Sequence, residues 1–141
     1  MPEPTLNIRL PARPEAVGEL LDRLEGYVAA TTLPSVVAHR LALICEELAA
    51  NVAMHGAAAG DGATYFEISV DCSPAGLTIS IEDDGPAFDP LAQEAPDVEQ
   101  ALEEREIGGL GIHLVRQFAR RVSYARTGNR NRLTAALDIT A

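Results

Sequence analysis

Two segments with a period of two place the strongest constraint on the fold of this chain. In residues 65–72 every second side chain is apolar, and residues 77–81 repeat the pattern after a short turn at residues 74–76. The apolar positions are Phe66, Ile68, Val70, Cys72, Leu77, Ile79 and Ile81. A strand pair of this kind has one apolar face and one polar face. We therefore expect a β-hairpin whose apolar face is covered by helices.

Three other segments have the apolar spacing of amphipathic helices. The first begins at Pro14, the second runs from about Pro34 to Gly56, and the third covers residues 110–119. The first helix is expected to bury Val17, Leu20, Leu21, Leu24 and Val28. The second is expected to bury Val37, Leu41, Ile44, Leu48 and Val52.

Further strands are expected near both ends of the chain. Residues 5–10 form one, residues 122–125 form another, and a turn over residues 128–131 leads into a last strand over residues 133–139. The order is then strand, two helices, hairpin, loop, helix, hairpin, within one domain of residues 1–141. Helices grouped on one side of a mixed, mainly antiparallel sheet make a two-layer α/β sandwich.

Composition and charge exclude several classes of protein. A chain of 141 residues with 47% apolar side chains can form one core without disulfides or metal. The formal net charge of −10 argues against direct binding of nucleic acid, whose phosphates attract clustered cations. No apolar run approaches the ~20 residues of a membrane span, and the amino terminus lacks the features of a signal peptide. We expect a cytoplasmic protein that binds neither nucleic acid nor membranes.

The cysteines, the histidines and the lack of lysine argue against a disulfide, a zinc site and a P-loop. Cys45 and Cys72 lie in apolar contexts, so buried thiols are expected, and the three histidines lack zinc-ligand spacing. The sequence contains no Lys. The lysine of a P-loop is therefore missing, and a nucleotide site would need another way of binding phosphate.

One polar pair lies in the second predicted helix, in the segment EELAAN of residues 46–51. Glu47 and Asn51 are four residues apart, so both side chains project from one face, beside the apolar stripe of this helix, which is called its seam below. A general base and a magnesium ligand could lie side by side there. Polar pairs at this spacing are also common on solvated helix surfaces, and the pair alone does not decide between these interpretations.

A second polar segment, Asp83-Asp84-Gly85-Pro86, follows the predicted hairpin. All of these residue types also favour ordinary turns. In a functional interpretation, the Asp83 carboxylate accepts a hydrogen bond from an exocyclic amine and so selects adenine over guanine.

A third segment, GGLG at residues 108–111, opens the last predicted helix. Backbone N–H groups and the helix dipole favour phosphate at such a position, and glycines let the backbone approach closely. Leu110 would pack beneath the turn and hold it. A flexible hinge or a helix start without a ligand is the alternative.

In this order the three segments resemble the N, G1 and G2 boxes of the GHKL (histidine kinase-like) ATPase superfamily. They are most similar to its bacterial anti-sigma serine/threonine kinase branch, from the second helix to the final strand. The resemblance implies a Bergerat-type ATP-binding fold. It makes Glu47 the general base, Asn51 the Mg²⁺ ligand and Asp83 the adenine-binding acid. Gly85 would leave room for the ring, and Ala87 replaces the usual second glycine of the G1 box.

The resemblance also assigns the phosphate end of the site. Gly108, Gly109 and Gly111 would cradle phosphate, residues 86–107 would form the ATP lid, and Arg105 would neutralise the γ-phosphate.

The implied activity is that of an ATP- and Mg²⁺-dependent serine/threonine protein kinase in signal transduction. Such a kinase phosphorylates a small STAS-type anti-sigma antagonist and holds a sigma factor until the unphosphorylated antagonist captures the kinase. Transcription is then regulated by partner switching, and homodimerisation is implied as well. Two alternatives remain. One is a nucleotide-sensing module that sequesters a partner without phosphoryl transfer, which the replacement of a G1-box glycine by Ala87 supports. The other is a plain ATPase.

Overall fold

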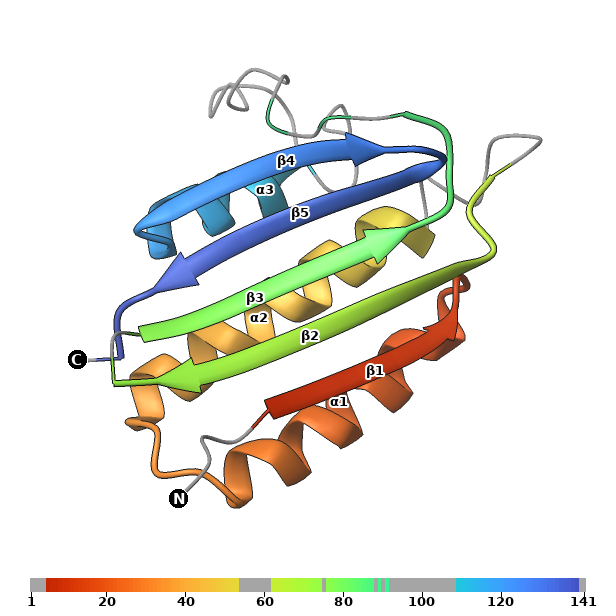
Figure 1. Ribbon diagram of the computed structural model, residues 1–141. Coiled ribbons are helices and arrows are strands. Elements are labelled where there is room, and N and C mark those ends of the chain that lie inside the picture. The colour runs from red at the N-terminus through yellow and green to blue at the C-terminus, as the bar shows by residue number, and fades with distance from the viewer. Residues whose placement is uncertain are drawn as a thin grey trace.

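Three helices lie against one face of a five-stranded sheet in the computed structural model, which describes residues 5–53, 62–74, 76–87, 89, 91 and 109–139 (Figure 1). The helices are α1 (Glu15–Ala29), α2 (Ser35–Asn51) and α3 (Gly109–Phe118). The strands are β1 (Thr5–Pro11), β2 (Tyr65–Ser73), β3 (Gly76–Asp83), β4 (Arg121–Thr127) and β5 (Arg130–Leu137). The predicted two-layer α/β sandwich is confirmed. None of the described helices has the length and apolar character of a membrane span.

All neighbouring strands in the described sheet are antiparallel, in the spatial order β1-β2-β3-β5-β4. Strand β3 is therefore central. Its last residue, Asp83, has Phe66 of β2 on one side and Asn131 of β5 on the other. The end of β3, the end of α2 and the start of β5 lie at the same end of the sandwich (Figure 1).

The last strand starts earlier than the sequence pattern predicted. It begins at Arg130 and ends at Leu137, whereas residues 133–139 were expected. The reason is a two-residue turn: Gly128 has a φ of +60°, and Thr127 pairs directly with Arg130. A glycine at the first central position of a tight hairpin turn supplies the positive φ that continues the ladder to its tip. Asn131 is consequently a strand residue and not part of the turn.

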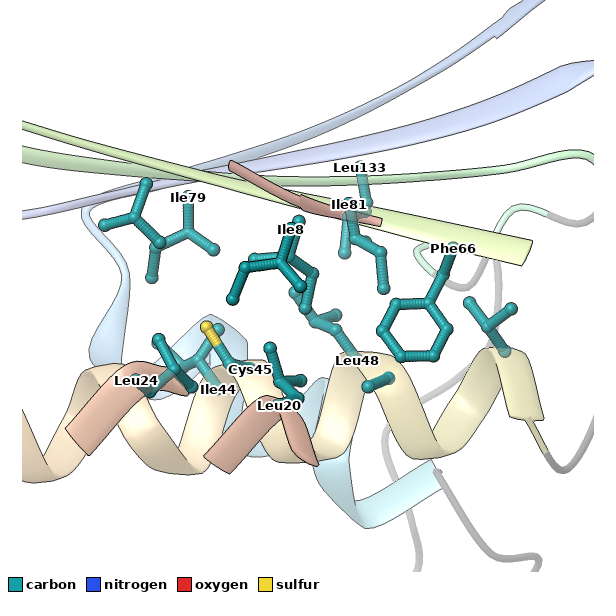
Figure 2. Close-up of a cluster of buried hydrophobic side chains, with 14 of the residues drawn as sticks. Ile8, Leu20, Leu24, Ile44, Cys45, Leu48, Phe66, Ile79, Ile81 and Leu133 are labelled. Carbon is teal, nitrogen blue, oxygen red and sulfur yellow. The ribbon is translucent and has the colours of Figure 1, made fainter. Parts of the chain in front are cut away.

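The core lies between the helices and the sheet, where apolar side chains from both layers meet (Figure 2). The predicted seam of α2 is confirmed, because all of its members are buried: Val37, Leu41, Ile44, Leu48 and Val52. In α1, Leu20 and Leu24 are buried, and the other predicted members are partly buried against the same core. Each fully buried side chain of this size contributes about 1.5–3 kcal/mol relative to an exposed one. This packing fixes α2 against the sheet.

Two predicted boundaries fall where the structure describes few residues. Helix α2 is described to Asn51, and Val52 and Ala53 continue in a wider, π-type turn. The predicted stop at Gly56 and most of the predicted lid lie outside the described residues.

The two cysteines occupy different environments. Cys45 is completely buried, and burial raises its pKa to about 12. Cys72 is only partly buried. The expectation of buried thiols is therefore right for Cys45 and right only in part for Cys72.

Candidate functional site

The polar pair of α2 lies at the edge of the core, as its position beside the seam predicted. Glu47 and Asn51 are both partly exposed, next to the buried Leu48. Burial raises the pKa of the Glu47 carboxyl above its ordinary value, and the charge of Glu46 raises it further. A raised pKa makes this carboxylate a better proton acceptor than an exposed glutamate.

The amide oxygen of Asn51 is a second unusual feature of this helix. Its Oδ1 is buried and has no hydrogen-bond partner within the described part of the chain. Most buried side-chain oxygens are hydrogen-bonded, so an exception calls for an explanation. Amide oxygens are among the hard ligands that Mg²⁺ accepts, and Glu47 lies one helical turn before this oxygen. The donor set thus fits a magnesium ligand beside a base.

The acid at the end of β3 is buried and already hydrogen-bonded at one oxygen. Asp83 is 9% exposed. Its Oδ1 accepts hydrogen bonds from the backbone N–H of Gly85 at 2.8 Å and from Nδ2 of Asn131 at 3.0 Å. Both bonds that the structure gives this carboxylate reach the same oxygen, which leaves Oδ2 to accept a hydrogen bond from a ligand.

Gly85 is required by close packing. A Cβ at this position would lie 3.0 Å from Oδ1 of Asp83 and 3.2 Å from Cβ of Ala63. Both distances are shorter than ordinary carbon contacts of about 3.5–4.0 Å. The resemblance predicted that this glycine leaves room for a ring, and the structure adds that Ala63 and Asp83 occupy the space beside it. Ala87, two residues later, is exposed.

The neighbouring Asp84 connects the turn to the start of β2. Its Oδ1 accepts hydrogen bonds from the N–H groups of Thr64, at 2.7 Å, and Tyr65, at 3.2 Å, and its Oδ2 accepts one from the Thr64 hydroxyl. Burial raises the pKa of Asp84, but these hydrogen bonds outweigh that effect and hold the pKa below its ordinary value. Asp84 therefore fixes the end of β3 against the segment that enters β2.

The glycine-rich segment opens a helix as predicted. Helix α3 begins at Gly109, so its first turn includes Gly109, Leu110 and Gly111, and α3 packs beside α2. The backbone N–H groups of that first turn have no partners within the helix. Arg105, Gly108 and the side chain of Leu110 lie outside the described residues, and their predicted roles stay predictions.

Three functional candidates lie outside the motifs seen in the sequence: Tyr124 and Arg126 of β4, and Asn131 of β5. Asn131 is 7% exposed and contacts Asp83, and its own amide oxygen accepts bonds from the other two side chains. One signal was available. The buried positions of β5 alternate from Leu137 back through Ala135 and Leu133, so the same period places residue 131 on the apolar face.

The fold has the arrangement that the resemblance to GHKL ATPases predicted. Helices cover one face of an antiparallel sheet, a buried acid ends the central strand, and a glycine follows two residues later. The histidine kinase-like ATPase domain family matches residues 10–137. The chain therefore belongs to the histidine kinase-like ATPase domain family.

The individual proteins similar to this chain include a serine/threonine-protein kinase and a histidine kinase. The serine/threonine-protein kinase BtrW of Bordetella bronchiseptica is 29% identical over 94 residues, which are 67% of this chain and 66% of BtrW. The crystal structure of the RsbU and RsbW domains of Rv1364c from Mycobacterium tuberculosis has a TM-score of 0.65 at 15% identity, covering 98% of this chain and 33% of that one. The blue-light activated histidine kinase EL346 of Erythrobacter litoralis has a TM-score of 0.52 at 15% identity, covering 92% and 42%. At this identity the two structures show the shared fold. The chain thus spans slightly less than two thirds of BtrW and a third of the Rv1364c chain.

Proposed function

We propose that this domain binds Mg-ATP and transfers the γ-phosphoryl group to a serine or threonine of a small STAS-type anti-sigma antagonist. The observation that carries the proposal is the pair on α2. Asn51 has a buried amide oxygen with no hydrogen-bond partner among the described residues, and Glu47 has a carboxylate with a raised pKa. Membership of the ATPase family supports ATP as the nucleotide, and similarity to a serine/threonine kinase supports the acceptor class.

Each residue has a distinct task in this reaction. Oδ2 of Asp83 accepts a hydrogen bond from the adenine amine, and the first turn of α3 binds phosphate oxygens through backbone N–H groups. Asn51 would hold Mg²⁺, which would neutralise charge on the phosphates. Glu47 accepts the proton of the acceptor hydroxyl. The hydroxyl oxygen forms a bond to the γ-phosphorus, the bond from that phosphorus to the bridging oxygen breaks, and ADP leaves.

The physiological consequence would be regulation of transcription by partner switching. The kinase would hold a sigma factor until the unphosphorylated antagonist captures the kinase, and phosphorylation of the antagonist would reverse this exchange. We propose that the active form is a homodimer in the cytoplasm.

Calorimetric titration with ATP, with and without Mg²⁺, tests the nucleotide site. The wild type should bind ATP more tightly with Mg²⁺, and Asp83→Asn should weaken binding at least about tenfold, the equivalent of ~1.4 kcal/mol. Asp71→Asn is the matched control, because Asp71 is exposed and lies in β2, opposite Thr78. Equal ATP affinity in Asp83→Asn and the wild type would refute the assigned adenine contact.

Transfer of radiolabelled phosphate to antagonist domains encoded beside the gene tests the enzyme. Glu47→Gln should abolish transfer and leave ATP binding intact, whereas Glu46→Gln, the adjacent control, should retain transfer. The rival binding module predicts a different result: Glu47→Gln would leave partner sequestration unchanged, and the wild type would transfer no phosphate.

A further inference from the structure

Asn131 is a buried polar side chain to which the proposed reaction gives no task. It is 7% exposed and lies directly opposite Asp83 across the β3–β5 ladder. A buried amide is costly unless its oxygen and both N–H groups are hydrogen-bonded. Its partners therefore indicate why a polar residue stands in an otherwise apolar row of β5.

The oxygen end of this amide is fixed by two side chains of β4. Oδ1 of Asn131 accepts hydrogen bonds from the Tyr124 hydroxyl and from Nη1 of Arg126, the latter at 3.1 Å. A guanidinium only donates hydrogen bonds, so the amide cannot be turned the other way without losing Arg126. Tyr124, Arg126 and Asn131 together are called the hairpin clamp below.

The nitrogen end of the amide reaches the turn that follows β3. Nδ2 of Asn131 donates to Oδ1 of Asp83 at 3.0 Å and to the carbonyl of Pro86 at 2.8 Å, with the carbonyl of Gly85 farther away at 3.5 Å. Arg126 donates to that same Gly85 carbonyl at 2.7 Å. The hairpin clamp thus holds both the carboxylate and the backbone beyond it.

This arrangement determines which oxygen of Asp83 faces a ligand. Because the Gly85 N–H and Asn131 both occupy Oδ1, the carboxylate cannot rotate without losing two hydrogen bonds. Oδ2 is then held in one place as an acceptor. An amine donates to such an oxygen, whereas the carbonyl of guanine at the same position would face it without a proton.

We infer that Asn131, oriented by Tyr124 and Arg126, is a positioning residue that enforces the choice of adenine over guanine at Asp83. The inference rests on the proposed ATP site. It predicts that loss of Asn131 lowers nucleotide selectivity as well as affinity, because a mobile carboxylate favours the amine less strongly.

The test compares ATP and GTP binding, each with Mg²⁺, in three proteins by calorimetry. The wild type should prefer ATP. In Asn131→Ala the Kd for ATP should rise about tenfold and the preference over GTP should fall by a similar factor. Asn129→Ala is the matched control, since Asn129 is exposed in the turn of the same hairpin, and it should behave as the wild type.

Two further variants separate positioning from folding. Tyr124→Phe removes only a hydroxyl that orients the amide, and it should reduce the preference for ATP in the same direction but less. Asn131→Ser keeps a donor near Asp83 and should recover part of the preference. Folded variants that lose stability but keep the wild-type ratio of ATP to GTP affinity would overturn the inference. Absence of ATP binding by the wild type would instead refute the proposed ATP site.

Discussion

Replacing Gly85 by alanine is expected to destabilise the fold, although the added group is a single methyl. The new Cβ would lie 3.0 Å from Oδ1 of Asp83, 3.2 Å from Cβ of Ala63 and 3.3 Å from the Ala63 nitrogen. Two of these neighbours are parts of a small residue, Ala63, and the third is held by two hydrogen bonds. None of the three can move away as the end of a long side chain would.

The expected cost follows from this geometry. Adding a methyl group to a well-packed region costs about 1–3 kcal/mol. Displacing Gly85 also stretches its 2.8 Å hydrogen bond to the Asp83 carboxylate, and bonds to charged groups contribute about 1.5–3 kcal/mol when intact. Together, the steric cost and the partial loss of that hydrogen bond should lower the free energy of unfolding by about 2 kcal/mol. For a domain of this size the melting temperature should fall on the order of 6 °C.

Urea and thermal unfolding of Gly85→Ala measure this effect, with Gly18→Ala as the matched control. Gly18 is exposed in α1, and a Cβ there meets nothing within 4 Å. In a helix interior alanine is more favourable than glycine by about 0.5–1 kcal/mol, so the same substitution should stabilise at residue 18. The reasoning is refuted if Gly85→Ala is as stable as the wild type while Gly18→Ala behaves as expected.

Three further predictions concern ionisation. Because the folded-state pKa of Glu47 is raised above 4.5, its ionised form destabilises the fold, and Glu47→Gln should be more stable than the wild type at neutral pH. Unfolding measured below pH 4.5 should show no difference in stability between the two proteins. The folded-state pKa of Asp84 is lowered below 3.8, so its hydrogen bonds stabilise the fold above pH 3.8, and this stabilisation is lost as the pH falls through the folded-state pKa. Asp84→Asn should therefore be less stable at neutral pH, and its stability should depend less on pH in the acid range. In the folded protein a thiol reagent at mildly alkaline pH should modify Cys72 and spare Cys45, whose pKa is about 12, and equal rates for both would contradict the packing of α2.

Most secondary structure was predictable because burial follows local spacing. The stripe of α2 and the alternation in β2 and β3 each record which side of an element faces the core. Similarly, Glu47 and Asn51 lie next to that stripe whatever the tertiary structure, and Asp83 ends its strand because an aspartate and a glycine follow it. These parts of the candidate site are predicted from residue type and position alone.

The hydrogen bonding, ionisation and close contacts of these residues were not predictable in this way. No local pattern says that Oδ1 of Asn51 has no hydrogen-bond partner among the described residues, or that burial raises the pKa of Glu47. Both depend on what packs against α2. The steric need for Gly85 comes from Ala63, which lies 22 residues away in the chain and arrives with the segment entering β2.

The helices and the central hairpin follow from residue spacing along single elements, and the fold class follows from the order of those elements. The contact between Asn131 and Asp83 depends instead on the tertiary structure. That contact requires a tight turn at Gly128, the pairing of β5 with β3 and the side chains of β4 to orient the amide. A hydrogen bond between residues 48 positions apart depends on strand order and register, which are set by how all the strands pair.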